Sequence, residues 1–202
     1  KPLLPLGTRF DIITRELLLG KSRACLLGIN GMCKTEVLQR IFSDLQNPLY
    51  MENNVVEQLQ LYMQARIGYA QVQLEQDWDN LLRQLLSGPV LLLVDGFDQA
   101  LVLDVRSYPA RGISEPDAEP VVRGARDGFV ETMLFNANLI RRRIRSPRLT
   151  FRLCSVGTDS KTDVALAYVD DLADAGLVKQ AAESLARLQV SSLTMGAKSL
   201  EE

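Results

Sequence analysis

The chain has 202 residues, which is enough for one ordinary domain or two small ones with a buried core. Its 23 lysines and arginines balance 25 aspartates and glutamates, so the net charge is -2 and we expect no nucleic-acid partner. The chain contains no histidine, which removes the commonest general base and the usual transition-metal ligand. We therefore expect a protein that is not an enzyme and has no metal and no cofactor.

The cysteines and the hydropathy pattern indicate the compartment. Cys25, Cys33 and Cys154 are an odd number without CxxC spacing, which favours free thiols in a reducing compartment over a disulfide framework. No apolar run reaches the roughly 18 to 20 residues that span a bilayer, and no signal peptide is evident. The sequence predicts a soluble piece of a protein that continues beyond it.

Residues 1–106 predict a small α/β subdomain with the order β-β-α-α-α-β-β. Residues 10–19 and 24–29 read as an antiparallel pair of strands around a short polar turn. Apolar periodicity then predicts three helices, over residues 37–45, 55–67 and 74–85. The last of these helices is expected to carry Leu74, Trp78, Leu81, Leu82 and Leu85. Residues 90–95 and 100–105 flank a Gly-Phe-Asp-Gln turn and predict a hairpin.

Residues 107–147 predict a charged loop followed by a linker helix. Apolar residues recur at spacings of three and four, which predicts an amphipathic helix over residues 129–145, about 25 Å long. Asp127-Gly128 supplies its start, and Ser146-Pro147 its end. Its apolar stripe consists of Val130, Met133, Leu134, Ala137, Ile140 and Ile144.

Residues 148–202 predict a second α/β subdomain that repeats the opening of the first. Residues 25–45 align without a gap to residues 165–185, with apolar residues matching at eleven positions. Upstream, residues 15–20 align to residues 152–157. Nothing after Leu188 matches the hairpin of the first unit, so we expect this copy to be incomplete, with an unpaired sheet edge. The predicted fold is α/β (α+β mixed): two small subdomains with mixed or antiparallel sheets, joined by a long helix.

Residues 28–35, GINGMCKT, nearly match the phosphate-binding pattern G-x-x-x-x-G-K-[ST], with Lys34 in the lysine position. Cys33 replaces the second glycine, although the loop needs unusual backbone angles and close approach to the phosphates. Asp95 follows an apolar strand, as a metal-holding aspartate does, but Asp95-Gly96 looks like the bend of a hairpin. A degenerate nucleotide-binding domain therefore stays a minor alternative.

Charged residues of both signs are concentrated between positions 106 and 145. Arginines and carboxylates at this density can interlock as bidentate pairs that fasten the loop to the linker helix, or they can form a surface for a partner. The arginines at the helix end interact favourably with the helix dipole. They could also contact an acidic neighbouring subunit or anionic lipid headgroups. The candidate interaction residues are Arg106, Arg111, Glu115, Asp117, Arg123, Arg126, Asp127, Arg141, Arg142, Arg143 and Arg145.

Three stretches carry a resemblance to a known family: SYPARGISEPDAEPVVRGARDGFVE, FNANLIRRRIRSPRL and SVGTDSKTDVALAYVDDLAD. They resemble the soluble N-terminal region of the spore-germination GerA family, which comprises the A subunits of nutrient germinant receptors and SpoVAF-like proteins. FDIITREL and INGMCKTEVLQRIF are more similar to the SpoVAF-like branch. The resemblance covers nearly the whole chain.

The resemblance implies a role in a membrane protein of the spore inner membrane, with this domain on the cytoplasmic (spore core) side. The domain would assemble subunits, or couple a signal to an ion-conducting complex that promotes germination. Its partners would be other copies of the same subunit and other spore germination membrane proteins. An alternative is a small-molecule sensing domain that binds a germinant in the cleft between the subdomains.

Overall fold

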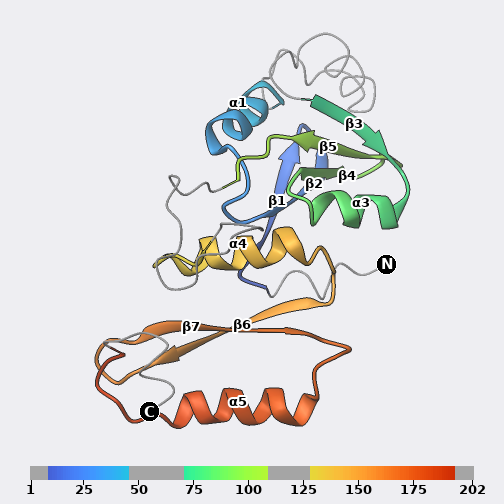
Figure 1. Ribbon diagram of the computed structural model, residues 1–202. Coiled ribbons are helices and arrows are strands. Elements are labelled where there is room, and N and C mark those ends of the chain that lie inside the picture. Colours follow the sequence, from blue (N-terminus) through green and yellow to red (C-terminus); the bar gives the residue numbers. More distant parts are fainter. Residues whose placement is uncertain (1–8, 46–70, 109–127, 194–202) are drawn as a thin grey trace, which may run out of the picture.

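The computed structural model describes residues 9–45, 71–108 and 128–193. In these ranges the chain forms a five-stranded sheet, a two-stranded sheet and four helices (Figure 1). The predicted helix over residues 55–67 lies outside the described residues. The α+β class predicted from the sequence is confirmed, and both sheets are antiparallel. The division into subdomains at residues 106 and 147 stays a prediction.

The first sheet has the strand order β1-β2-β4-β5-β3. Its first hairpin consists of β1 (Ile12–Leu19) and β2 (Ser22–Ile29), and its second of β4 (Val90–Val94) and β5 (Ala100–Asp104). Both hairpins were predicted from the sequence and are confirmed. β2 and β4 also pair with each other, which joins the hairpins into one sheet.

Each face of the first sheet carries its own apolar core. On one face, Leu92 and Val94 pack with Ile41 of helix α1 (Thr35–Leu45). On the other face, Leu91 packs with Leu81 of helix α3 (Trp78–Leu85). Alternate residues of β4 thus enter opposite cores, which explains why this strand is an uninterrupted apolar run.

The prediction that Leu74 belongs to a helix was wrong. Leu74 lies in β3 (Gln71–Glu75), an edge strand opposite β5, and the predicted element order lacks this strand. Helix α3 begins later because the Asp77 side chain accepts a hydrogen bond from Asn80 N at 2.9 Å and caps the helix there. Leu74 sits at a spacing that fits the helical stripe, so periodicity alone could not separate the two elements.

The second sheet follows the predicted repeat. It is a hairpin of β6 (Leu149–Val156) and β7 (Thr162–Val169), followed by helix α5 (Ala175–Arg187). A shift of 140 positions carries the bounds of β2 onto β7 and the start of α1 onto the start of α5. A shift of 137 positions carries β1 onto β6.

The repeat extends to the hydrogen bonds that close each hairpin. Asn30 N donates to Asp11 O at 2.8 Å, and at the equivalent positions Asp170 N donates to Arg148 O at 2.9 Å. Residues 12–45 and 149–187 therefore form the same β-β-α block. We call residues 9–45 and 71–108 the first unit, and residues 149–193 the second unit.

The linker helix, α4 (Met133–Arg143), is shorter than predicted, about 16 Å at 1.5 Å per residue. The expected start at Asp127-Gly128 was wrong, because the helix begins after its N-cap residue, Thr132. The Asn136 side chain accepts from Val130 N at 2.8 Å and donates to Val130 O at 2.7 Å. Because these two bonds use the backbone N–H and C=O of Val130, this residue does not take part in the hydrogen bonds of the helix, which begins after it.

Helix α4 lies between the five-stranded sheet and the β6–β7 hairpin (Figure 1). It contacts the first unit at the turn after β2, where Gly31 has a φ of +74°. A Cβ at Gly31 would lie 2.9 Å from Asn138 Nδ2 and 3.1 Å from Leu134 Cδ2. Glycine meets two requirements at position 31: it adopts the left-handed conformation without strain, and it has no Cβ that would clash with α4.

Replacing Gly31 with alanine should therefore lower the free energy of unfolding by about 3 kcal/mol, from backbone strain together with the clash against α4. Gly96→Ala is the matched control: its φ is +83° but nothing lies within 4 Å of its Cβ position, so only about 1 kcal/mol of strain applies. Urea denaturation of both variants measures the difference. If both variants lose the same free energy of unfolding, α4 does not pack closely enough on Gly31 to clash with an added methyl group.

Candidate functional site

The most unusual feature of the described residues is a buried ion pair between the first unit and α4. Arg141, on α4, and Asp11, just before β1, both have side chains that are 0% exposed. Arg141 Nε and Nη2 donate to Asp11 Oδ2 at 3.0 and 2.7 Å. Burial lowers the pKa of Arg141, and the Asp11 carboxylate opposes that effect. Arginine stays charged in proteins, so Asp11 is the counter-ion that this burial requires.

The same guanidinium also holds the start of the second unit. Arg141 Nη1 donates to Ser146 O at 2.8 Å, and Arg141 Nη2 donates to Leu149 O at 2.9 Å. Its carbon lies 5.3 Å from the centroid of the Phe151 ring, in the range of a cation–π contact. One side chain thus joins the first unit, α4 and β6.

A second arginine crosses the same boundary from the opposite direction. Arg9 precedes β1 and is buried, yet it donates to Pro147 O at 2.6 Å and to Leu149 O at 2.9 Å. Its Nη2 also lies 3.3 Å from Asp170 Oδ2, at the end of β7. We refer to Arg9, Asp11, Arg141 and Asp170 as the charged junction.

An amide completes the contact on the α4 side. Asn138 is fully buried one turn before Arg141, and its Nδ2 donates to Asn30 O at 3.0 Å. Among the described residues, Asp11 Oδ1 and Asn138 Oδ1 are buried without a hydrogen-bond partner. Buried polar atoms without a hydrogen bond lower the free energy of unfolding. We therefore interpret the junction as fixing how α4 packs on the first unit, not as a large contribution to stability.

Arg141 is therefore not available for the partner or lipid contact that was one of the expectations for the arginines at this helix end. The expected apolar stripe of α4 also differs, because its fully buried residues are Ala137, Asn138 and Arg141. Ile144 follows the helix and is 41% exposed. The sequence contains one local signal for this buried face. Asn138 and Arg141 are three positions apart and lie on the same side of the helix as Ala137.

The other arginines of the cluster remain on the surface. Arg142 lies over the Tyr108 ring, with its guanidinium carbon 4.6 Å from the ring centroid. Arg143 is exposed, and Arg145 donates from its Nε to Arg142 O at 3.2 Å. These three side chains form an exposed basic end of α4, which we call the basic helix end.

Arg106 pairs locally. Its Nε donates to Asp104 Oδ1 at 2.7 Å, and this bond lowers the pKa of Asp104. Arg106 therefore stabilises the end of β5. The nearby Tyr108 hydroxyl donates to Ser87 O at 2.9 Å. The remaining candidates lie outside the described residues: Arg111, Glu115, Asp117, Arg123, Arg126 and Asp127.

The geometry does not favour nucleotide binding by residues 28–35. β2 and β4 are antiparallel, whereas phosphate-binding enzymes hold the loop strand and the metal strand in a parallel sheet. Asp95 sits at the tight turn of the β4–β5 hairpin, where Gly96 has a positive φ. Side chains of α4 fill the space above Gly31, which a phosphate would need.

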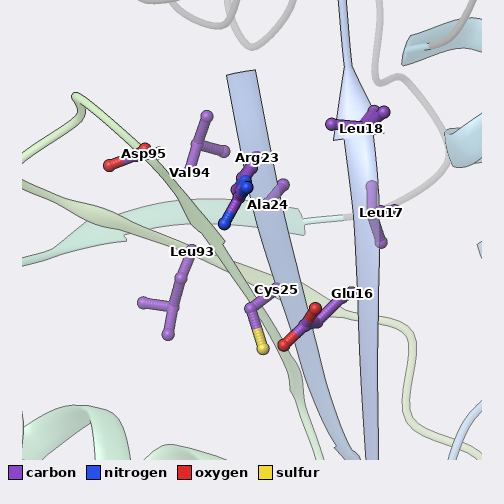
Figure 2. A pocket seen from close by; sticks show the side chains of 9 residues that line it. All are labelled: Glu16, Leu17, Leu18, Arg23, Ala24, Cys25, Leu93, Val94 and Asp95. Atoms are coloured by element: carbon purple, nitrogen blue, oxygen red, sulfur yellow. The ribbon is translucent and has the colours of Figure 1, made fainter. Parts of the chain in front are cut away.

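A groove of about 520 Å³ lies along strands β1, β2 and β4, with Glu16, Cys25 and Leu93 among its lining residues (Figure 2). Glu16 and Cys25 face each other across the β1–β2 ladder in its floor. Burial, and then Glu16, raise the pKa of the Cys25 thiol, so the nucleophilic thiolate is disfavoured. Leu18, on its rim, is 62% exposed. The groove has the character of an open surface, not of a catalytic site.

A second cavity, of about 480 Å³, lies at the boundary between the units, against Phe10, Phe151 and Tyr168. Its polar wall is largely occupied: Arg9 is bonded to Asp170, and the Thr150 hydroxyl donates to the same carboxylate at 2.9 Å. The bonds of Arg9 and Thr150 to Asp170 would have to break before these side chains could bind a small molecule. The cavity therefore gives little support to germinant sensing in the cleft.

The family model described as Bacillus/Clostridium GerA spore germination protein matches residues 5–202 of the chain. The chain belongs to the GerA spore germination family. The resemblance predicted from the sequence is thereby confirmed.

Two GerA relatives come from Bacillus subtilis (strain 168). The chain is 39% identical to stage V sporulation protein AF over 98% of its own length and 40% of that protein. It is 28% identical to the uncharacterized membrane protein YfkQ over 91% of its length and 36% of that protein. The chain thus spans well under half of the relatives that it matches.

The fold of this GerA chain also occurs in a solved structure. The N-terminal domain of the A subunit of the Bacillus megaterium spore germinant receptor GerK3 aligns with a TM-score of 0.70 and 23% identity, over 98% of this chain and 74% of that one. Among the described residues, no helix is long and apolar enough to cross a membrane.

The charged junction can be tested by a double-mutant cycle in this GerA chain. Asp11→Ala leaves the Arg141 charge buried without its counter-ion and should lower the free energy of unfolding by about 3 to 5 kcal/mol. Adding Arg141→Met removes the unpaired charge and should restore about 2 kcal/mol of that loss. Urea denaturation measures each corner of the cycle.

The matched control is the exposed pair between Arg148 and Asp171, whose side chains are 62% and 40% exposed. Asp171→Ala should cost less than about 1 kcal/mol, because water already screens both charges. A loss of similar size at Asp11 and Asp171 would contradict a structural role for the buried pair.

Proposed function

We propose that this chain is a non-catalytic module of a SpoVAF-like spore germination membrane protein, and that the module contributes to subunit assembly or couples a signal to an ion-conducting complex. The observation that carries the proposal is the charged junction. Arg141 bonds to Asp11 of the first unit and to Leu149 O of the second unit, so a displacement of one unit is transmitted to the other. A coupling element needs such a rigid connection between its two surfaces.

The proposed place of action is the inner membrane of the spore, with this module on its cytoplasmic side. The family supports a place in the spore, and the membrane-protein relative supports a place at a membrane. The basic helix end is the surface that we assign to contacts with other subunits or with anionic headgroups, since its three arginines are exposed within four positions of one another. Other copies of the subunit and other germination membrane proteins are the proposed partners.

The basic helix end can be tested by charge reversal in the full-length protein. Arg142→Glu, Arg143→Glu and Arg145→Glu together should reduce the size of the membrane complex and slow germination. The variant should lose about 2 kcal/mol of stability, through the Arg142 contact with Tyr108 and through negative charge placed at the C-terminal end of α4. Native electrophoresis of solubilised spore membranes measures assembly, and the fall in optical density of spores measures germination.

The control carries the same change of charge on exposed arginines elsewhere: Arg15→Glu, Arg83→Glu and Arg187→Glu. This control should assemble and germinate as the wild type does. If the basic-end variant folds and both readouts match the control, the basic helix end has no part in assembly.

A further inference from the structure

Charges of opposite sign gather in two separate stretches of this nearly neutral chain. Between positions 132 and 158 there are six arginines and no aspartate or glutamate. Between positions 71 and 105 there are six aspartates and glutamates and one arginine. The molecule therefore carries a basic surface and an acidic surface, although its net charge is only -2.

Five of the carboxylates lie at one end of the first sheet, where β3 ends, α3 begins and β4 turns into β5. They are Glu75, Asp77, Asp79, Asp95 and Asp98, which we call the acidic end. A hydrogen bond of 3.1 Å from Gln76 Nε2 to Asp98 Oδ2 joins the start of α3 to the β4–β5 turn. Among the described residues, none of the five has a lysine or arginine partner, and no carboxylate group is arranged to hold a metal ion. The acidic end is therefore available to a basic surface.

The groove of Figure 2 opens beside the acidic end. Asp95 belongs to both, and Glu16 supplies a second carboxylate to the lining. One arginine, Arg23, also lines the groove. The apolar part of the lining includes Leu93 and Leu18, of which Leu18 is 62% exposed. An apolar surface thus continues into an acidic one.

The basic helix end has the complementary features. Ile144 lies among its arginines and is 41% exposed. Arg142 and Arg145 form no ion pair within residues 9–45, 71–108 and 128–193. Because Arg142 is already held over the Tyr108 ring, it loses less side-chain freedom when it binds a carboxylate. The basic helix end therefore presents an apolar side chain surrounded by cations.

We propose that the basic helix end of one copy of this chain binds to the groove and the acidic end of a second copy, with Ile144 against Leu18 and Leu93. Charge complementarity favours a second copy over a lipid surface, because lipid headgroups would leave the acidic end unpaired. The two surfaces are different, so the contact is heterologous and each copy has room for two neighbours. This inference rests on the proposed function, since it names the partner of the basic helix end.

Cross-linking between two copies tests the contact in the full-length protein in membranes. One copy carries Arg145→Cys and the co-expressed copy carries Asp95→Cys, both with Cys25→Ala, which removes the native thiol from the groove. A short bismaleimide should link this pair at about ten times the yield of a control pair in which Arg187→Cys, on the exposed side of α5, replaces Arg145→Cys. Each variant expressed alone gives the background. Equal yields in the two pairs, or no linked dimer in either, would overturn the proposal.

An exchange of charges shows whether the named residues make the contact. Arg142→Glu with Arg143→Glu in the first copy should lower the yield about fivefold, because like charges then face each other. Asp79→Lys with Asp98→Lys in the second copy should lower it similarly. Both changes together should restore the yield, which misfolded variants would not do. If the combined pair stays as low as either change alone, the proposal is wrong.

The outcome separates this inference from the proposed function. If the cross-link is absent but the triple charge reversal at the basic helix end still reduces assembly, the basic helix end binds a different partner. In that case the contact with a second copy is overturned and the proposed function stands. If the triple charge reversal also has no effect, both are overturned.

Discussion

The arrangement of this GerA chain depends on one buried ion pair. Arg141 cannot lose its charge and cannot reach water, so Asp11 must stay beside it and the segment before β1 must stay against α4. The same guanidinium bonds to Leu149 O, which fixes where β6 begins. Close packing at Gly31 and the Arg9–Asp170 contact add to this constraint. The orientation of the two units therefore follows from a few polar contacts.

The two units contain the same β-β-α block in different surroundings. In the first, β4, β5 and α3 enclose the block, so Met32 and its neighbours form a core on the second face of the sheet. In the second, the equivalent Leu172 is exposed, and within the described part of the chain β7 pairs only with β6.

Local sequence signals predicted much of the fold but little of the junction. The two hairpins of the first sheet and the repeat at residues 149–187 depend on alternation, turns and apolar spacing, which are local. The position of Leu74 could not be read this way, because its strand forms only against β5. Arg141 looked like one of several arginines at a helix end. Its burial depends on Asp11, 130 positions earlier, and no pattern within the helix specifies such a partner.

The measurement that tests the central claim most directly is native-state hydrogen exchange at increasing urea, comparing the wild type with Asp11→Ala/Arg141→Met. The double variant has no unpaired buried charge and has lost the Arg141 link between the units, while the Arg9 contacts remain. In the wild type, amides of β6 and β7 should open together with those of the first sheet. In the double variant, they should open at a lower free energy than the first sheet. If the two sheets still open together in that variant, the ion pair does not couple the units.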